Sequence, residues 1–274
     1  PKPGPLAGTG HHMGGKIMQA RERLPAKGER ILSLRGVSKR FGAVSALTDI
    51  DLDVHAGEVV ALVGDNGAGK STLVKIIAGN FRASTGRIFI KDQEVVLHNP
   101  LDARRHGIEI VYQDLALCDN LTAAANVFLG RELTRRIGPI RINDYAAMNR
   151  RAAGLFGELK SETRPRDLVR QMSGGQRQAV AIARTRLSNA DIVLMDEPTA
   201  AISVRQVAEV LNLIRRLRDQ GVAVVLISHR MPDVFGLADR VVVLRRGEVV
   251  ADKPVEATSP QEVTGLITGA IEHV

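Results

Sequence analysis

One short segment of the chain has the composition of a phosphate-binding loop. Gly64 to Ser71, Gly-Asp-Asn-Gly-Ala-Gly-Lys-Ser, fits the pattern G-x-x-x-x-G-K-[ST]. Its glycines let the backbone bend so that successive N–H groups point at phosphate oxygens, and a helix starting there adds partial positive charge. We expect Lys70 to reach the β- and γ-phosphates of a nucleoside triphosphate and Ser71 to coordinate Mg²⁺.

A second segment delivers two adjacent carboxylates. The apolar run Ile192 to Met195 is followed by Asp196 and Glu197. We expect Asp196 to hold Mg²⁺ through water and Glu197 to polarise the attacking water in phosphoryl transfer. If the extended chain continues, the two side chains point to opposite sides, which fits two different roles. Without the phosphate loop, two solvated acids at a strand end would be the simpler interpretation.

Two further polar positions favour phosphate chemistry. His229 follows the apolar run Val222 to Ile227, and ligands of open α/β sheets bind beyond the carboxyl ends of strands, which predicts a γ-phosphate contact. Ser173 is a good N-cap for a helix predicted from Gln176 to Leu187. Gly174 and Gly175 have free N–H groups at that helix start, which could make a second anion site, although taken alone these residues are explained more simply by a capped helix.

The elements that must position these residues are those of an α/β protein. The buried strand Val59 to Val63 precedes the glycine-rich loop, and a helix through Leu73 to Ile77 follows it. Buried strands alternating with helices indicate a largely parallel sheet covered on both faces. The remaining predicted elements are strands at 31–34, 50–54, 192–195, 222–227 and 241–244 and a short helix at 260–267.

The middle of the chain differs from this pattern. Residues 115–170 are rich in Ala and Leu at helical spacing, as in Tyr145 to Leu159, with no strong strand, and predict a helical subdomain inserted into the core. Residues 1–29, with Pro1, Pro3 and Pro5, predict a flexible tail, and residues 30–274 are expected to form one domain.

Composition restricts the protein class. In 274 residues, hydrophobic residues make up 44% and charged residues 25%, which predicts a globular core and argues against global disorder. The single cysteine, Cys118, excludes an internal disulfide. No apolar run approaches the ~18 residues of a membrane helix. The net charge of +8 comes from arginines scattered along predicted helices, which fits either a solvated face or a lipid or nucleic-acid contact.

These motifs occur in an order that resembles the ATP-binding cassette of ABC transporters from about Ile31 to the end. The phosphate loop at 64–72 comes first, followed by Gln113 in Val-Tyr-Gln-Asp as the Q-loop. Met172-Ser-Gly-Gly-Gln176 resembles the signature, Asp191 to Glu197 resembles Walker B, and His229 resembles the switch histidine. Phe41 stands where the family places an aromatic residue under adenine.

The resemblance implies a P-loop NTPase core with a mixed, largely parallel sheet, an N-terminal antiparallel β-subdomain and an inserted helical subdomain. It implies that Gln113 joins Ser71 and Asp196 at Mg²⁺ and that Glu197 and His229 are catalytic. The implied ATP-binding residues are Phe41, Gly64, Asp65, Asn66, Gly67, Ala68, Gly69, Lys70, Ser71, Thr72 and Gln113.

The resemblance also implies partners. Two cassettes pair head to tail, so Ser173, Gly174, Gly175 and Gln176 of one chain act on ATP held by the other, and a second copy of this chain is the simplest partner. The helical subdomain would meet transmembrane permease subunits, which place the chain on the cytoplasmic face of the membrane. An extracytoplasmic solute-binding protein is implied indirectly, and nucleic acid is not expected as a partner.

Two positions depart from the family pattern. Met172 replaces the usual Leu, a near-isosteric exchange. Ser203 replaces the usual Asp of the loop after Walker B, which puts the usual cross-dimer contact in doubt. This feature, with the stretches Gly64 to Asn80 and Asp196 to Val204, resembles the branch that imports monosaccharides.

Two other functions stay open from the sequence. A soluble ABC ATPase acting on ribosomes or nucleic acid is permitted by the basic charge, although the chain has one phosphate loop and no heptad run. A module that binds ATP without hydrolysis is disfavoured because both Glu197 and His229 are present.

Overall fold

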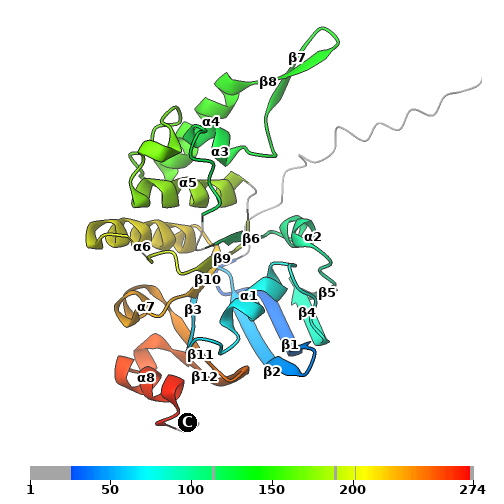
Figure 1. Cartoon of the computed structure of the whole chain (residues 1–274), viewed down its shortest axis with the longest axis vertical. Helices are drawn as coiled ribbons and strands as arrows, with labels where there is room; N and C mark the ends of the chain where they lie inside the picture. Colours follow the sequence, from blue (N-terminus) through cyan, green and yellow to red (C-terminus); the bar gives the residue numbers. More distant parts are fainter. Residues whose placement is uncertain (1–25, 113–114, 188–189, 201, 272–274) are drawn as a thin grey trace, which may run out of the picture.

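The computed structural model describes residues 26–112, 115–187, 190–200 and 202–271. Within these ranges the chain forms a six-stranded sheet, a four-stranded antiparallel sheet and a helical region that stands at one end of the molecule (Figure 1). The predicted fold class is confirmed, since the larger sheet is mixed and largely parallel and the helical region is inserted into the α/β core.

The six-stranded sheet carries the predicted chemistry at one edge. Its order is β12-β11-β3-β10-β9-β6, and all neighbours are parallel except the antiparallel edge strand β12. The carboxyl ends of β3, β9 and β10 therefore lie side by side. The strands are β3 Val59–Gly64, β6 Ile108–Val111, β9 Ile192–Asp196, β10 Ala223–Ile227, β11 Arg240–Arg245 and β12 Glu248–Pro254.

Strand β3 is buried on both faces, as its continuous apolar sequence predicts. Val59, Ala61 and Val63 pack into the hydrophobic core on the side of the helical region, while Val60 and Leu62 pack into a second core with the first helix and the antiparallel sheet. The phosphate loop that follows β3 thus starts from a strand fixed on both sides.

The antiparallel sheet has the order β2-β1-β4-β5. Its first two strands are longer than the short strands predicted at 31–34 and 50–54, because pairing continues through several register shifts that bend the ribbon. The strands are β1 Arg30–Phe41, β2 Val44–His55, β4 Thr85–Ile90 and β5 Gln93–Val95. Of the predicted tail, residues 1–25 lie outside the described residues, and the Gly28 N–H donates to the Ala56 carbonyl at 3.0 Å.

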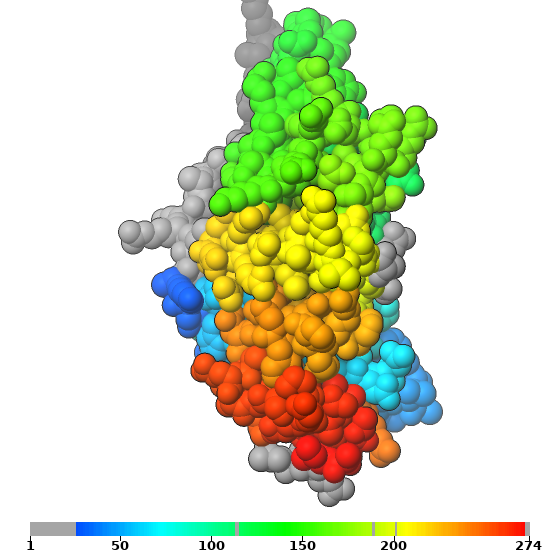
Figure 2. Space-filling view, turned by 90° about the vertical axis from the view of Figure 1, so that its left-hand side faces the viewer, coloured from blue at the N-terminus to red at the C-terminus, as the bar shows by residue number. Residues whose placement is uncertain are grey.

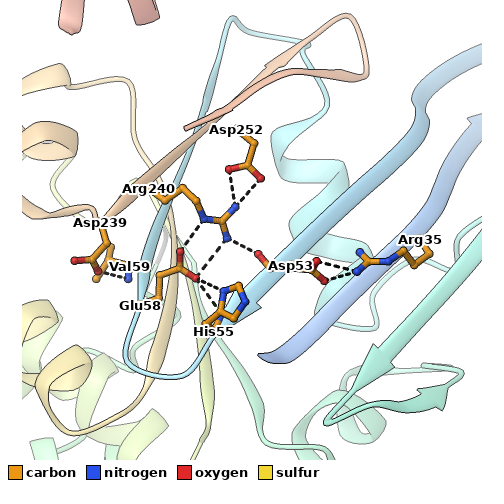
Figure 3. A network of polar contacts seen from close by, with 8 residues as sticks. All are labelled: Arg35, Asp53, His55, Glu58, Val59, Asp239, Arg240 and Asp252. Atoms are coloured by element: carbon orange, nitrogen blue, oxygen red, sulfur yellow. Dashed lines mark hydrogen bonds and ion pairs between the residues drawn. The ribbon is translucent and has the colours of Figure 1, made fainter. Parts of the chain in front are cut away.

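A polar network joins the two sheets (Figure 3). Arg240, at the start of β11, donates to Glu58 at 2.7 Å, to Asp252 on β12 at 2.6 Å and to the Asp53 carbonyl on β2. Burial lowers the pKa of the Arg240 guanidinium, but the hydrogen bonds and charges of Glu58 and Asp252 outweigh it, so the net shift is upward. Arg240 therefore stays charged and holds β2 against the amino end of β11, at the end of the sheet opposite the phosphate loop.

The helices lie on both sides of the larger sheet. The helices α1 and α2 belong to the antiparallel-sheet side, α6 packs on β10, and α8 packs on β11 (Figure 1). They are α1 Lys70–Ile77, α2 Pro100–Arg105, α3 Ala123–Val127, α4 Tyr145–Glu158, α5 Gly174–Leu187, α6 Val204–Asp219, α7 Met231–Leu237 and α8 Pro260–Thr268, with 3-10 turns at Val169–Gln171 and Val255–Ala257. No helix in the described part of the chain is long and apolar enough to cross a bilayer.

The helical region contains an element that the sequence analysis missed. Residues 115–170 hold α3 and α4 as predicted, but between them β7 (Thr134–Ile137) and β8 (Ile140–Asn143) form an antiparallel hairpin. The expectation of no strong strand here is wrong. The two strands were missed because each has only four residues and the surrounding segment is rich in Ala and Leu.

A buried ion pair connects this region to the core. Glu109 on β6 has a side chain that is 4% exposed. Its carboxylate lies 2.5 Å from the guanidinium of Arg131, which follows α3, and 3.4 Å from that of Arg104 in α2. A buried carboxylate without such partners would be strongly destabilising, so the pair fixes the helical region relative to β6.

Candidate functional site

The phosphate loop lies between the carboxyl end of β3 and the start of α1, as predicted. Two of its glycines are required by space and backbone conformation. Gly64 has φ 154°, and a Cβ there would lie 2.3 Å from the Leu244 carbonyl oxygen. Gly69 has φ 106°, and a Cβ there would lie 2.7 Å from the Ala46 carbonyl oxygen. The loop is therefore held between the end of β11 and the start of β2.

Lys70 is half-buried at the opening of this loop. Its Nζ donates to the carbonyl oxygens of Gly64 and Asp65 at 2.8 and 2.9 Å. Burial lowers the pKa of the Lys70 ammonium, and the attraction of Glu197, Asp65 and Asp196 opposes that shift. Both direct partners are neutral carbonyls, so the charge remains available to a phosphate group.

Asp196 ends β9 beside the carboxyl end of β10, where its Cα pairs with that of Ile227. Burial, together with the neighbouring Glu197 carboxylate, raises the pKa of Asp196, and attraction by Lys70 and Lys75 offsets only part of the shift. The carboxylate thus lies in a setting where a further positive charge would be stabilising.

Glu197 does not continue the strand. Its φ is 50°, in the left-handed region, and its N–H donates to the Ile227 carbonyl at 3.0 Å. The expectation that Asp196 and Glu197 point to opposite sides of a continuing extended chain is wrong, because the chain turns at Glu197 itself. A non-glycine residue in this conformation is strained and needs support from its surroundings.

His229 supplies part of that support. Its Nδ1 lies 2.8 Å from Glu197 Oε1, while Glu197 Oε2 is buried and has no hydrogen-bond partner. The histidine side chain is 69% exposed and the glutamate side chain 15%. Glu197 therefore has one oxygen oriented by the histidine and one oxygen enclosed without a hydrogen-bond partner.

A second contact holds the same two segments together. The buried Thr199 Oγ1 donates to Asp233 Oδ2 at 2.6 Å, and Arg230 lies 3.4 Å from that carboxylate. This contact fastens the chain after Glu197 to α7, which follows His229. Sequence reasoning missed Thr199 and Asp233, and nothing in their spacing or type distinguishes them from ordinary polar residues.

Lys70, Asp196, Glu197 and His229 line one cavity of about 410 Å³. Most predicted nucleotide-binding and catalytic residues line it, and so do three residues that were not predicted, Ala46, Ala200 and Ile227. The predicted site residues that line the cavity are Asn66, Gly67, Ala68, Gly69, Lys70, Ser71, Thr72, Asp196, Glu197 and His229.

The donor set of this cavity fits a hard divalent cation. Ser71 and Asp196 both line it and offer a hydroxyl and a carboxylate oxygen, the ligand types that Mg²⁺ takes together with substrate phosphates. Among the described residues no group of three His, Cys, Asp or Glu side chains could hold a metal by itself.

The signature residues lie elsewhere. Ser173 caps α5: its Oγ accepts from the Gln176 N–H at 3.3 Å, while Gln176 Oε1 accepts from the Ser173 N–H at 2.9 Å. Ser173, Gly175 and Gln176 line a groove of about 450 Å³ between α5 and α6 that shares no lining residue with the first cavity. Within one chain, the two phosphate-seeking elements are not brought together.

Three other predicted positions have different outcomes. Phe41 is 44% exposed and contacts Phe81 edge to face at 5.4 Å, but it is not part of the cavity lining. Gln113 lies outside the described residues. Ser203 caps α6 in a capping box with Gln206, so the residue at the departure from the family pattern has a local structural role.

Comparison with known proteins gives one family. The profile of the family described as ABC transporter matches residues 47–200. The xylose/arabinose import ATP-binding protein of Sulfolobus acidocaldarius is 42% identical over 239 residues, which is 87% of this chain and 94% of that protein. The ribose import ATP-binding protein of Geobacillus kaustophilus is 40% identical over 87% of this chain, but the match spans only 48% of that longer protein.

Solved structures agree with the fold. A nucleotide-free ATP-binding cassette from an ABC transporter superposes with a TM-score of 0.74 at 23% identity, covering 87% of this chain and 95% of the other. A dimeric cassette in a post-hydrolysis state, bound to ADP and phosphate, gives a TM-score of 0.66 at 26% identity over 82% of this chain and 99% of the other.

Proposed function

The chain belongs to the ABC transporter family, and we propose that it is the ATP-hydrolysing cassette that drives solute import through membrane subunits formed by other chains. The observation that carries the proposal is the convergence of Lys70, Asp196, Glu197 and His229 on one cavity beyond three neighbouring strands. A module that only binds ATP would not need a carboxylate that a histidine orients beside the cavity.

The phosphates of ATP occupy the loop after β3. Backbone N–H groups at the start of α1 point at the phosphate oxygens, and Lys70 exchanges its two carbonyl contacts for the β- and γ-phosphates. Ser71 and Asp196 would hold Mg²⁺, which neutralises charge that develops on the γ-phosphoryl group. Gln113 remains a further proposed ligand.

Glu197 acts on the attacking water. The carboxylate accepts the proton of a water placed between it and the γ-phosphate, while His229 keeps Oε1 in position. Because His229 is more than two-thirds exposed, its ring is also accessible to the γ-phosphate at the open side of the cavity.

The complete site needs a second cassette. Ser173, Gly175 and Gln176 line a groove that shares no residue with the cavity of their own chain, so we expect them to contact ATP held by another chain. A head-to-tail pair of identical chains satisfies both sites, and a related cassette of known structure is dimeric.

The solute is a monosaccharide. Relatives that match 87% of this chain are named for import of xylose and arabinose or of ribose. The cassette would lie on the cytoplasmic face of the membrane, bound to permease subunits, with a solute-binding protein on the other side. The ribosome or nucleic-acid alternative is not favoured, since these relatives are import proteins.

Reconstitution tests this proposal. The chain is purified with the membrane proteins that bind it, placed in proteoliposomes, and assayed for Mg²⁺-dependent ATP hydrolysis with the solute-binding protein and xylose, arabinose or ribose. We expect hydrolysis to rise with one of these sugars and to vanish in Lys70→Ala. Isolation of the chain with ribosomes or DNA instead of membrane proteins would contradict the transport function.

A further inference from the structure

The hairpin of β7 and β8 projects from the end of the molecule opposite α8 (Figure 1). Its base is fixed, because the Asp144 N–H donates to the Leu133 carbonyl at 2.7 Å and Leu133 packs against the large hydrophobic core. Beyond this base, the two strands pair only with each other. The space-filling view shows the same end, in green, rising above the rest of the molecule (Figure 2).

The tip of the hairpin is entirely apolar. Ile137 pairs with Ile140 across a two-residue turn of Gly138 and Pro139. The two isoleucines are 54% and 62% exposed, and Gly138 has φ 59°, the positive value such a tight turn requires. Pro139 has no N–H, so the turn presents fewer polar groups than an ordinary one.

Arginines occupy the strand positions next to this apolar tip. Arg136 lies directly opposite Arg141, and Arg135 lies opposite Ile142. Like charges placed directly opposite each other destabilise a two-stranded ribbon. No acidic residue occurs from 133 to 143, and no ion pair is found for the three arginines within the described residues. This arrangement lowers the stability of an already marginal hairpin unless an anion binds beside it.

We propose that this hairpin binds the surface of an anionic phospholipid bilayer. The apolar tip from Ile137 to Ile140 enters the boundary between headgroups and acyl chains, and the arginines one and two residues behind it contact lipid phosphates. One residue of a strand spans about 3.4 Å, so the charged positions lie at headgroup depth when the tip is inserted. Nucleic acid would satisfy the arginines but would leave the apolar tip in water.

The surrounding charge supports the same occupant. Arg131 is paired with Glu109, but from Thr134 to Arg151 the chain has five further arginines and only one acidic residue, Asp144. A basic cluster of this kind is attracted to anionic lipid at a rate and affinity that fall with salt. This binding goes beyond ATP hydrolysis, and none of the hairpin residues lines the nucleotide cavity.

Co-sedimentation of the purified cassette with vesicles tests the proposal. Vesicles of phosphatidylcholine with 30–40% phosphatidylglycerol (about one anionic lipid in three, a strongly negative surface) are compared with pure phosphatidylcholine. We expect binding only to the anionic vesicles, reduced roughly thirtyfold in Arg136→Gln/Arg141→Gln, since each arginine near such a surface contributes about a factor of five. Ile137→Ser/Ile140→Ser should lose at least about tenfold.

A charge-matched control separates the hairpin from net charge. Arg87→Gln/Arg105→Gln removes two arginines whose side chains are 63% and 77% exposed elsewhere on the surface, and it should bind nearly as well as the native chain. ATP hydrolysis should be native in all three variants, which shows that they fold. Equal loss in the control, or no preference for anionic vesicles, would overturn the proposal. Hairpin-dependent binding to membrane proteins in detergent, without vesicle binding, would also overturn it in favour of a protein partner.

Discussion

Replacement of Glu197 by Gln isolates the proposed proton acceptor. The left-handed conformation at φ 50° is no harder for Gln than for Glu, and a Gln Oε1 can still accept from His229 Nδ1–H at the observed 2.8 Å. Fold, cavity shape and phosphate contacts should therefore persist. Only the proton affinity of the side chain at position 197 changes, because an amide is a very weak base.

The expected size of the effect follows from that single change. General base catalysis contributes roughly 100- to 10,000-fold, which corresponds to about 3–5 kcal/mol of activation free energy at 1.36 kcal/mol per factor of ten. We expect hydrolysis in Glu197→Gln to fall by that factor while the affinity for ATP changes less than about threefold. Bound ATP should then persist and favour the dimer, because the substrate that links the two chains is not consumed.

Single-turnover hydrolysis of radiolabelled ATP, equilibrium binding of a fluorescent ATP analogue and size-exclusion chromatography measure the three quantities. The matched control is Glu94→Gln, which alters an exposed side chain whose ion pair with Arg87 is long, at 3.9 Å. This control should leave the hydrolysis rate, the ATP affinity and the dimer fraction unchanged. A single-turnover rate in Glu197→Gln within tenfold of the native rate would refute the role of Glu197 as the base. Loss of ATP binding would instead show that Glu197 supports the phosphate loop.

Four other changes test other parts of the site and fold. Asp196→Asn should abolish Mg²⁺-dependent turnover yet raise the melting temperature of the nucleotide-free chain at pH 7. The folded state raises the pKa of Asp196, so the ionised carboxylate lowers stability at a pH above that pKa. The difference in melting temperature between variant and native chain should therefore shrink as the pH falls through the pKa of Asp196. A lower melting temperature at pH 7 would contradict this sign. Lys70→Ala should weaken ATP binding and remove turnover, and unchanged hydrolysis would exclude the phosphate-loop role. Glu109→Gln should lower the free energy of unfolding in urea by about 2–3 kcal/mol, below the 3–5 typical of fully buried pairs because Arg131 is a quarter exposed, whereas a change under 0.5 kcal/mol would show that the pair is not structural. Ser173→Arg should abolish hydrolysis by blocking the partner's γ-phosphate, and full activity in that variant would end the head-to-tail model.

The sequence predicted best those features that depend on local backbone chemistry. The strand before Gly64, the helix from Lys70 and the capped start of α5 follow from short patterns of apolar residues, glycines and a serine, and each is present. The convergence of Asp196 and His229 with that loop was predictable too, because strand ends of a parallel sheet meet at one edge.

What could not be predicted depends on contacts between distant segments. The turn at Glu197 is stabilised by the Ile227 carbonyl and His229, neither of which is signalled in the residues around Glu197. The Thr199–Asp233 hydrogen bond joins residues 34 positions apart. The β7–β8 hairpin is a local element, but its strands are too short to give a periodic pattern of apolar residues. The Gly138-Pro139 pair between two isoleucines is the one local indication of its turn.

The position of β3 within its sheet has a consequence for how the chain is made. Both of its neighbours, β10 and β11, begin more than 150 residues later in the chain, at Ala223 and Arg240. At roughly 5–20 residues per second, a ribosome completes them about 10 to 35 s after the phosphate loop has been synthesised. During that interval the nascent loop lacks both strands that flank β3, and it also lacks His229. The nucleotide site can therefore be completed only after β10 and β11, which flank β3, have been synthesised.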